Sequence, residues 1–486
     1  MTTQTVAPVR PEGQKPLTIK NYLAFASGDA ANNIAFTMSG MFLVLYYTNV
    51  VGLSGAVIGT MFLVLRFVDA FTDLVMGRII DAATPGKLGK FRPLIRNWFL
   101  PLLLVNWLMY AAKLIFPDQS PLFYTVYMYV TYFLMGSVFY TIVNISYGSM
   151  APSLTQVPSE RAKLAGFRMY GTAGMVLLLS WVIAPLIKAY QTDPVGLQNA
   201  LALAVGLISL LAAGLYLFTV AGTIEQVARD PKPVTMKESF GALRVNRPLQ
   251  ILAASSVAVL MGITVLQTLG TYIALYVQQD ATYIAINQTA QTVALFAVSP
   301  FIPLMVRTIG KRIAYILVAT FLYVGILILW FAPLGQQPWL GSVAFFVLGL
   351  GVFGVNTLMW ALEADCVEFG EWKIGARTEG TTYAVFSFCR KMGQALGGFL
   401  GGFALVWAGF NAAEVAQGIQ PPEEVGRAIL FWALVFVIGS TAVGQLIMVV
   451  YPLSEAKFQQ IVQEIALRRG SPAGSREEDV KPSLET

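Results

Sequence analysis

Residues 65–77 read LRFVDAFTDLVMG and carry three charged side chains, Arg66, Asp69 and Asp73, in an otherwise apolar run. At about 100° per residue along an α-helix, the three side chains fall within an arc of roughly 60°, so one face of the helix is ionic and the rest is apolar. Each charge at the centre of a bilayer costs about 2.5–3.5 kcal/mol on insertion scales. Charges in such a position need a partner or a shared cavity.

The composition of the whole chain is that of a membrane protein. Of the 486 residues, 56% are hydrophobic and 12% are charged, whereas soluble domains carry roughly a quarter charged residues. The mean hydropathy is +0.65. Apolar segments of about 20 residues or more can cross a hydrocarbon core of roughly 30 Å as helices. We predict twelve such spans, at about 20–49, 55–80, 94–116, 122–151, 164–190, 197–221, 248–278, 284–307, 312–333, 339–369, 379–409 and 426–451.

The longest polar interruption, 225–248, lies at the midpoint of the chain and divides the spans into two sets of six. This division is typical of a transporter that is built from repeats and binds its substrate between the halves. We therefore expect an all-α membrane protein with a cytoplasmic N-terminal tail, an N-terminal six-helix bundle, a central cytoplasmic loop, a C-terminal six-helix bundle, and a cytoplasmic amphipathic helix with a disordered tail. The corresponding ranges are 1–19, 20–221, 222–247, 248–452 and 453–486.

The distribution of basic residues predicts the orientation. Lysines and arginines gather in the loops at 87–96, 229–247 and 307–312, while the loops on the other side show little more than Lys113 and Lys188. Basic loops stay in the cytoplasm, so both termini are expected there. The net charge of +6 follows from this topology, and it requires no nucleic-acid partner.

The residue types that the chain lacks narrow its chemistry. It has no histidine, so histidine-dependent catalysis is excluded and any proton relay must use carboxylates. Cys366 and Cys389 both fall in predicted spans, where we expect small packing residues without a disulfide or a metal. A membrane enzyme is disfavoured because the sequence has no nucleophile motif, metal-ligand cluster or sizeable soluble domain. No cofactor is expected.

The charges of the second span allow two interpretations. Arg66 can form a buried salt bridge with one aspartate, which leaves the other carboxylate over. Alternatively, Asp69 and Asp73, one turn apart and with Thr72 beside them, can hold a small cation through oxygen ligands or share a proton. The second interpretation makes this face a cation-coupling site.

Other spans carry polar faces that match the second one. A single asparagine or threonine in a span commonly serves an interhelical hydrogen bond, so the charged members of these faces carry more weight. The side chains in question are Asp29, Asn32 and Asn33 in the first span, Thr141 and Asn144 in the fourth, Arg168 in the fifth, Asn356, Glu363, Asp365 and Glu368 in the tenth, and Arg390, Lys391 and Gln394 in the eleventh.

Several motifs resemble those of one family, the glycoside-pentoside-hexuronide cation symporters of the major facilitator superfamily, which includes melibiose permease. The similarity covers roughly residues 18–465 and is strongest to bacterial glucuronide carriers. It implies two six-helix bundles that move around a central site by alternating access, and sugar uptake driven by H⁺ or Na⁺. The motifs are GDAANNIAF, YYTNVVG, DAFTDLVMGRIID with GKFRP, VNISYGSMA, MWALEADCVEFGEW, EGTTYAVFSF with RKMGQALGG, and YPLSEAKF.

The resemblance assigns roles to individual positions. The cation carboxylates correspond to Asp69 and Asp73, with Thr141 as a further oxygen ligand. The family has an asparagine where Thr72 stands here, which favours protons over Na⁺ at Asp69 and Asp73. The sugar-binding positions correspond to Asp29, Arg168 and Lys391, and we add Asn33, Asn144, Asn356 and Gln394 as substrate-binding candidates.

Three positions depart from the melibiose permease pattern. Asn144 replaces a sugar-binding aspartate, Gly148 a stacking tryptophan, and Asn356 a second tryptophan. The exchange of aspartate for asparagine removes a negative charge while Arg168 and Lys391 remain, so an anionic sugar is easier to accept. Glu363 returns a negative charge to the neighbourhood.

The function expected from these residues is uptake of a small-molecule glycoside, a glucuronide or other hexuronide, by a monomeric symporter in the inner membrane. Two alternatives use the same scaffold. One is a symporter for a neutral glycoside, pentoside or oligosaccharide, and the other is a carrier of lysolipids or similar amphiphiles, which would need an apolar slot open to the bilayer.

The cytoplasmic loops suggest a gate. Basic and acidic residues gather where the two halves would meet, and ion pairs across this seam could hold the outward-open state and break on inward opening. Setting the topology is the alternative role of the basic residues. The gating candidates are Arg78, Asp81, Arg92, Asp365 and Glu368.

Overall fold

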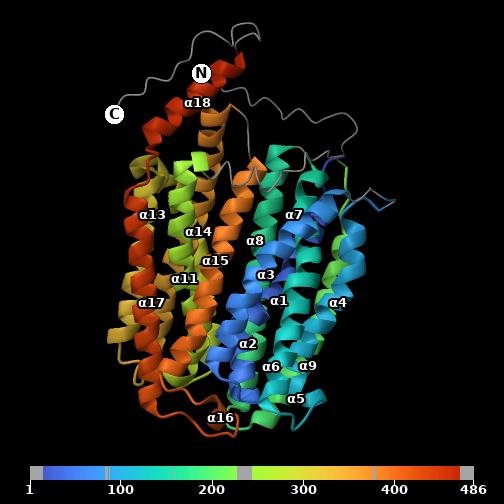
Figure 1. The fold of residues 1–486 in the computed structure, drawn as a ribbon, viewed down its shortest axis with the longest axis vertical. Helices are drawn as coiled ribbons and strands as arrows, with labels where there is room; N and C mark the ends of the chain where they lie inside the picture. Colours follow the sequence, from blue (N-terminus) through green and yellow to red (C-terminus); the bar gives the residue numbers. More distant parts are fainter. Residues whose placement is uncertain are drawn as a thin grey trace.

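The computed structural model describes residues 15–82, 86, 88–155, 157–226, 244–375 and 379–470. These residues form helices that run side by side along the long axis of the molecule (Figure 1), and among them the only strand-like pairing is an isolated bridge between Gly86 and Gly89. The all-α prediction is confirmed.

The N-terminal bundle consists of six long helical segments. The first is α1 (Ile19–Thr37), continued by the π-helical turns η1 (Met38–Phe42) and η2 (Tyr46–Val51) around α2 (Leu43–Leu45). The fourth is likewise continuous, because η3 (Phe133–Tyr140) joins α6 (Pro121–Tyr132) to α7 (Thr141–Leu154). The others are α3 (Gly55–Ala82), α4 (Arg92–Tyr110) with the short α5 (Ala112–Ile115), α8 (Pro158–Ala189) and α9 (Pro194–Gly222).

The C-terminal bundle repeats the arrangement. The eighth span consists of α12 and the first residues of α13, up to a kink at Gly310, where φ is 77° and ψ is 160°. A glycine is favoured at this φ because it has no Cβ. Past the last span, α18 lies across one end of the bundles (Figure 1), the end that the sequence predicts to be cytoplasmic. The helices are α11 (Arg247–Tyr276), α12 (Thr282–Val298), α13 (Phe301–Phe331), α14 (Trp339–Ile374), α15 (Glu379–Trp407), α16 (Ala412–Val415), α17 (Glu423–Val449) and α18 (Glu455–Gly470).

Local sequence signals set several of these helix starts. Asn246, followed by proline at the second helical position, caps α11 by accepting a hydrogen bond from the backbone N–H of Leu249. Ser120 caps α6 in the same way, with Pro121 as the first helical residue. A capping oxygen satisfies an N–H that the helix itself cannot, and proline near the start loses no hydrogen bond there.

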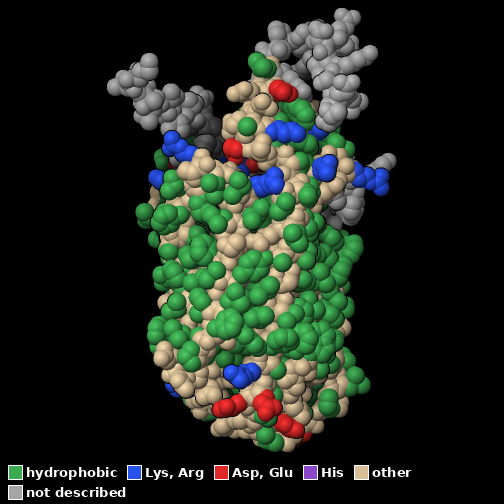
Figure 2. Space-filling model, turned by 90° about the vertical axis from the view of Figure 1, so that its left-hand side faces the viewer, with side chains coloured by type: hydrophobic (Ala, Val, Ile, Leu, Met, Phe, Trp, Pro, Cys, Tyr) green, Lys and Arg blue, Asp and Glu red, His purple; other side chains and the backbone are tan. Residues whose placement is uncertain are grey.

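The outer surface of the bundles is apolar. Nine helices of the described ranges are long and apolar enough to cross a membrane, and α4, α12 and α15 pack among them. Figure 2 shows a broad hydrophobic band on one face, with charged side chains at its two ends. The twelve-span fold is therefore confirmed, and the chain is a multi-pass membrane protein.

The two bundles touch closely along α3 and α15. A Cβ on Gly59 would lie 2.7 Å from the carbonyl oxygen of Phe399, and a Cβ on Gly402 would collide with the carbonyl oxygen of Gly55. Glycine is required here because the two backbones are too close for a side chain.

The outer ends of the bundles are hydrogen-bonded to each other. The Thr48 hydroxyl lies 2.7 Å from the Tyr272 hydroxyl, and the Asn49 amide donates to the Tyr276 hydroxyl at 2.9 Å. Lys188 Nζ of α8 lies 2.7 Å from a carboxylate oxygen of Asp280, in the loop between α11 and α12. Partial burial raises the pKa of Asp280, but Lys188 and Thr282 lower it by more, so the pKa lies below its ordinary value. These contacts close the outer end in this conformation.

Candidate substrate and cation site

A cavity of about 1100 Å³ lies between the bundles. Its N-terminal wall carries an acid and a base, Asp29 and Arg168, whereas its C-terminal wall is rich in neutral amides and aromatic rings. Amides suit sugar hydroxyls because they both donate and accept hydrogen bonds. The polar and aromatic lining residues include Asp29, Asn33, Arg168 and Thr172 on one side, and Gln267, Asn287, Gln288, Gln291, Asn356, Trp360 and Tyr383 on the other.

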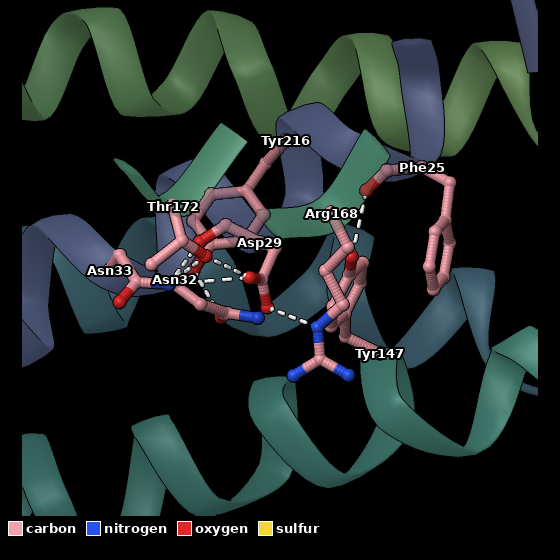
Figure 3. A network of polar contacts seen from close by, with 8 residues as sticks. All are labelled: Phe25, Asp29, Asn32, Asn33, Tyr147, Arg168, Thr172 and Tyr216. Atoms are coloured by element: carbon pink, nitrogen blue, oxygen red, sulfur yellow. Dashed lines mark hydrogen bonds and ion pairs between the residues drawn. The ribbon is translucent and has the colours of Figure 1, made fainter. Parts of the chain in front are cut away.

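Asp29 of α1 is the centre of a polar network in the N-terminal wall (Figure 3). One of its carboxylate oxygens accepts from Arg168 Nε at 2.9 Å, and the other accepts from the Thr172 hydroxyl. Asn33 donates to the Thr172 hydroxyl at 3.1 Å. The two terminal nitrogens of Arg168 point away from Asp29. Arg168 therefore keeps N–H donors for a ligand, but Asp29 balances its charge.

Aromatic side chains hold this network in place. Arg168 Cζ lies 5.5 Å from the ring centroid of Tyr147, whose hydroxyl donates to the carbonyl oxygen of Phe25 at 2.8 Å. The Tyr216 hydroxyl donates to the amide oxygen of Asn32 at 2.7 Å. Asn32 is thus a packing residue of the bundle, while its neighbour Asn33 reaches the cavity.

Asp69 and Asp73 of α3 meet hydroxyl groups of the fourth span. The Ser137 hydroxyl of η3 donates to Asp69, and the Thr141 hydroxyl of α7 lies 3.0 Å from Asp73. Thr72 instead donates to the backbone carbonyl of Asp69 at 3.1 Å, within its own helix. The predicted cation residues Asp69, Asp73 and Thr141 are therefore brought together, and Ser137 joins them.

Lys391 of α15 forms an ion pair with Asp73 across the two bundles. The Asp73 and Lys391 side chains are 29% and 25% exposed, so neither is fully buried, although neither is among the residues that line the cavity. Arg66 forms no ion pair with Asp69 or Asp73 within the described residues; its Cζ lies 5.6 Å from the ring centroid of Phe36. Lys391, which the family resemblance assigns to sugar binding, is thus paired with Asp73, which the resemblance assigns to cation binding.

Of the remaining substrate-binding candidates, only Asn356 is among the residues that line the cavity. Asn356 of α14 accepts a hydrogen bond from Arg390 at 2.9 Å. Asn144 of α7 and Gln394 of α15 are half-buried. Gly148 leaves open space, since a Cβ there would meet nothing within 4 Å.

A family model described as MFS/sugar transport protein matches residues 24–455. The chain belongs to this family of sugar transporters. The glucuronide carrier protein homolog of Escherichia coli strain K12 is 33% identical over 93% of this chain and 96% of its own. A putative 2,3-dihydroxypropane-1-sulfonate exporter of the same strain is 32% identical over 93% of this chain and 96% of its own.

Solved structures support the fold of this family. A nucleoside transporter superposes with a TM-score of 0.63 at 14% identity, covering 89% of this chain and all of its own. The resemblance to major facilitator sugar transporters is confirmed, and the protein is a sugar transporter, not an enzyme. Like its family, it is placed in the inner membrane.

Two of the gating candidates, Arg92 and Asp365, make contacts within their own bundles in this conformation. Arg92 donates to the carbonyl oxygens of Leu88 and Thr223 at 2.7 Å and 2.8 Å, and so binds the end of α9. Lys311 lies 2.7 Å from Asp365, and both belong to the C-terminal bundle. Glu368 lies half-buried near the end of α14. The side chains of Arg78 and Asp81, like most of the central loop and the two tails, lie outside the described residues.

Sequence reasoning missed several members of the site, among them Thr172, Ser137 and Tyr383. Thr172 lies one turn after Arg168, and Ser137 lies one turn before Thr141. Residues one turn apart share a helix face, so helical periodicity could have predicted both. Tyr383 follows a glycine and two threonines near the start of α15; the residue is 54% exposed and lines the cavity. A lone tyrosine in an apolar span gives no comparable signal.

Proposed function

We propose that this transporter imports a glucuronide or related hexuronide together with a proton. The observation that carries the coupling is the ion pair between Asp73 and Lys391, which joins the two bundles. The glucuronide carrier homolog in Escherichia coli supports the substrate class.

The position of Lys391 favours a proton over Na⁺. Oxygen atoms of Asp69, Asp73, Ser137 and Thr141 converge on this region and are the ligand type that a hard cation requires. The ammonium group of Lys391, however, already supplies the positive charge beside Asp73. A Na⁺ ion at Asp73 would have to displace it or bear its repulsion, whereas a proton needs only one carboxylate oxygen.

Protonation of Asp73 links the proton to the movement of the bundles. The protonated carboxyl group no longer attracts Lys391 as a charge, so α3 and α15 lose an ionic contact. Asp69, held by the Ser137 hydroxyl, is the second carboxylate that can share the proton. A proton bound here thus shifts the balance between conformations that keep this contact and conformations that break it.

The substrate lies in the cavity beside these groups. Asp29 accepts hydrogen bonds from sugar hydroxyls, and the terminal nitrogens of Arg168 donate to them. Asn33 and the amides of the opposite wall extend the same type of contact around the ring. The size of the cavity, about 1100 Å³, leaves room for a sugar and its aglycone.

Uptake of a labelled β-glucuronide into proteoliposomes that contain the full chain tests the proposal. Accumulation is expected with an inwardly directed proton gradient, and a protonophore should abolish it. Accumulation that needs a Na⁺ gradient instead would contradict the coupling ion. Accumulation of a neutral glycoside, without accumulation of the glucuronide, would contradict the proposed substrate class.

A further inference from the structure

Arg390 differs from Arg168 and Lys391 because, among the residues that the structure describes, no carboxylate pairs with it. Arg168 pairs with Asp29, and Lys391 pairs with Asp73. Within the described residues, the polar contacts of Arg390 are with uncharged groups, the Asn356 amide oxygen at 2.9 Å and the Met359 sulfur at 3.3 Å. Half-buried within the C-terminal bundle, it carries a positive charge that no described carboxylate pairs with.

Arg390 is not itself among the residues that line the cavity, but its guanidinium contacts residues that do. Its Cζ lies 4.9 Å from the ring centroid of Trp360, which stacks on Tyr383 at 5.7 Å. Asn356, Trp360 and Tyr383 all line the cavity that also holds Asp29. The aromatic contact and the amide restrict the side chain to one position, which is the preorganisation that a binding site requires.

The guanidinium retains unused donors. An arginine has five N–H groups, and two of those of Arg390 are directed to Asn356 and Met359. Glu363, further along α14, has an interaction of its own. An unpaired charge at this depth of a membrane protein is costly, and a ligand of opposite charge removes that cost.

We propose that Arg390, held by Asn356 and Trp360, binds the acidic group of the substrate, while Asp29 and Arg168 across the cavity bind its hydroxyls. This inference rests on the proposed function and deepens it, because it gives the substrate an orientation and makes Arg390 the residue that selects anions. The chemistry required of the ligand is a single negative group on a sugar, either a planar carboxylate or a tetrahedral sulfonate. A guanidinium fork can donate two parallel hydrogen bonds to either group.

Equilibrium binding to the purified full chain in lipid nanodiscs tests this assignment without requiring coupling. The probes are three glycosides with the same p-nitrophenyl aglycone: a β-glucuronide, the matched β-glucoside, and the 6-sulfonate analogue of the glucoside. The variants are Arg390→Gln, Arg390→Lys and Arg168→Gln. Arg427→Gln is the control, because it removes an exposed arginine at the outer end of α17.

Arg390→Gln should lower the affinity for the acidic probe that the wild type prefers by roughly 10- to 100-fold, the range for hydrogen bonds to a charged group. The affinity for the glucoside should change by less than about threefold, because only the acid–guanidinium contact is lost. Arg390→Lys, which keeps the charge but not the fork, should fall between. Arg168→Gln should weaken all probes alike. A comparison of the carboxylate and the sulfonate shows which acid the site accepts.

Equal losses for the glucuronide and the glucoside in Arg390→Gln would overturn the assignment, since Arg390 would then act only in packing. A wild type that prefers neither acid over the glucoside would overturn it as well. Proton-driven glucuronide uptake with an acid preference that survives Arg390→Gln would leave the proposed function standing and refute this inference. Acid-selective binding through Arg390 without proton-driven uptake would do the reverse.

Discussion

The ion pair between Asp73 and Lys391 allows a quantitative test of the coupling site. We consider Asp73→Asn, Lys391→Gln and the double variant. Two unit charges about 4 Å apart attract by about 4 kcal/mol at an effective dielectric constant of 20. Removal of one partner from a fully buried pair costs about 3–5 kcal/mol, whereas surface pairs contribute about 0–1 kcal/mol.

The exposure of this pair places it between those limits. The Asp73 and Lys391 side chains are 29% and 25% exposed, so water screens part of the attraction. We expect each single substitution to lower the free energy of unfolding by about 2 kcal/mol, because it leaves one charge uncompensated. The double variant should lose about 2 kcal/mol as well, less than the sum of the two, which gives a coupling energy of about 2 kcal/mol.

Unfolding of the four proteins in nanodiscs measures the coupling energy. Asp118→Asn, in the exposed outer loop after α5, is the matched control for a lost carboxylate. In proteoliposomes, Asp73→Asn should abolish concentrative uptake and leave exchange of substrate intact, because the carrier still reorients but binds no proton at this position. Strictly additive losses of stability, or full accumulation by Asp73→Asn, would refute the reasoning.

Three further outcomes are expected. Gly402→Ala should destabilise the protein by about 1–3 kcal/mol because its Cβ meets the neighbouring backbone. Gly439→Ala is the control and should leave stability unchanged, because a Cβ at this position of α17 meets open space. Thermal unfolding of the two variants measures the difference. Gly148→Trp should fill open space beside Asn144 and reduce transport of glycosides with bulky aglycones more than that of small ones, with little change in unfolding temperature. Lys188→Ala removes the ion pair with Asp280 and should lower the free energy of unfolding by about 0.5 kcal/mol. Since the pKa of Asp280 is lowered in the folded protein, this contribution is complete above about pH 4 and is lost as the pH falls through the lowered pKa. The difference in unfolding temperature between wild type and Lys188→Ala should therefore shrink in acid, and a constant difference would argue against the pair.

The positions of the spans could be predicted because length and hydropathy determine them. The second span, expected at 55–80, is α3 at 55–82, and the tenth, expected at 339–369, is α14 at 339–374. The eighth was harder, because α12 ends at Val298 and the helix restarts at Phe301 before the kink at Gly310. A break of this kind inside an apolar run leaves little trace in hydropathy.

The pairing of charges could not be predicted in the same way. Helical periodicity places Asp69 and Asp73 on one face of α3, but it does not say which residue of a distant helix faces them. Lys391 reaches Asp73 because glycines let α3 and α15 approach closely, a property of two helices in different bundles. For the same reason, the sequence alone could not show that Arg168 forms an ion pair with Asp29 whereas Arg390 has no such pair among the described residues.

The way these charges are balanced determines how the membrane voltage acts on transport. Asp29 and Asp73 are each matched by a base, so under the proposed mechanism a proton at Asp73 would add one positive charge and an acidic sugar at Arg390 would add one negative charge. A carrier that moves one proton with one monoanion transfers no net charge, so accumulation depends on the pH difference alone, by about tenfold per pH unit. A neutral glycoside carried with the same proton would instead move one charge, and a potential of 100 mV would add about 2.3 kcal/mol to its uptake. The electrical signature of transport thus reports the charge of the sugar without its identity being known.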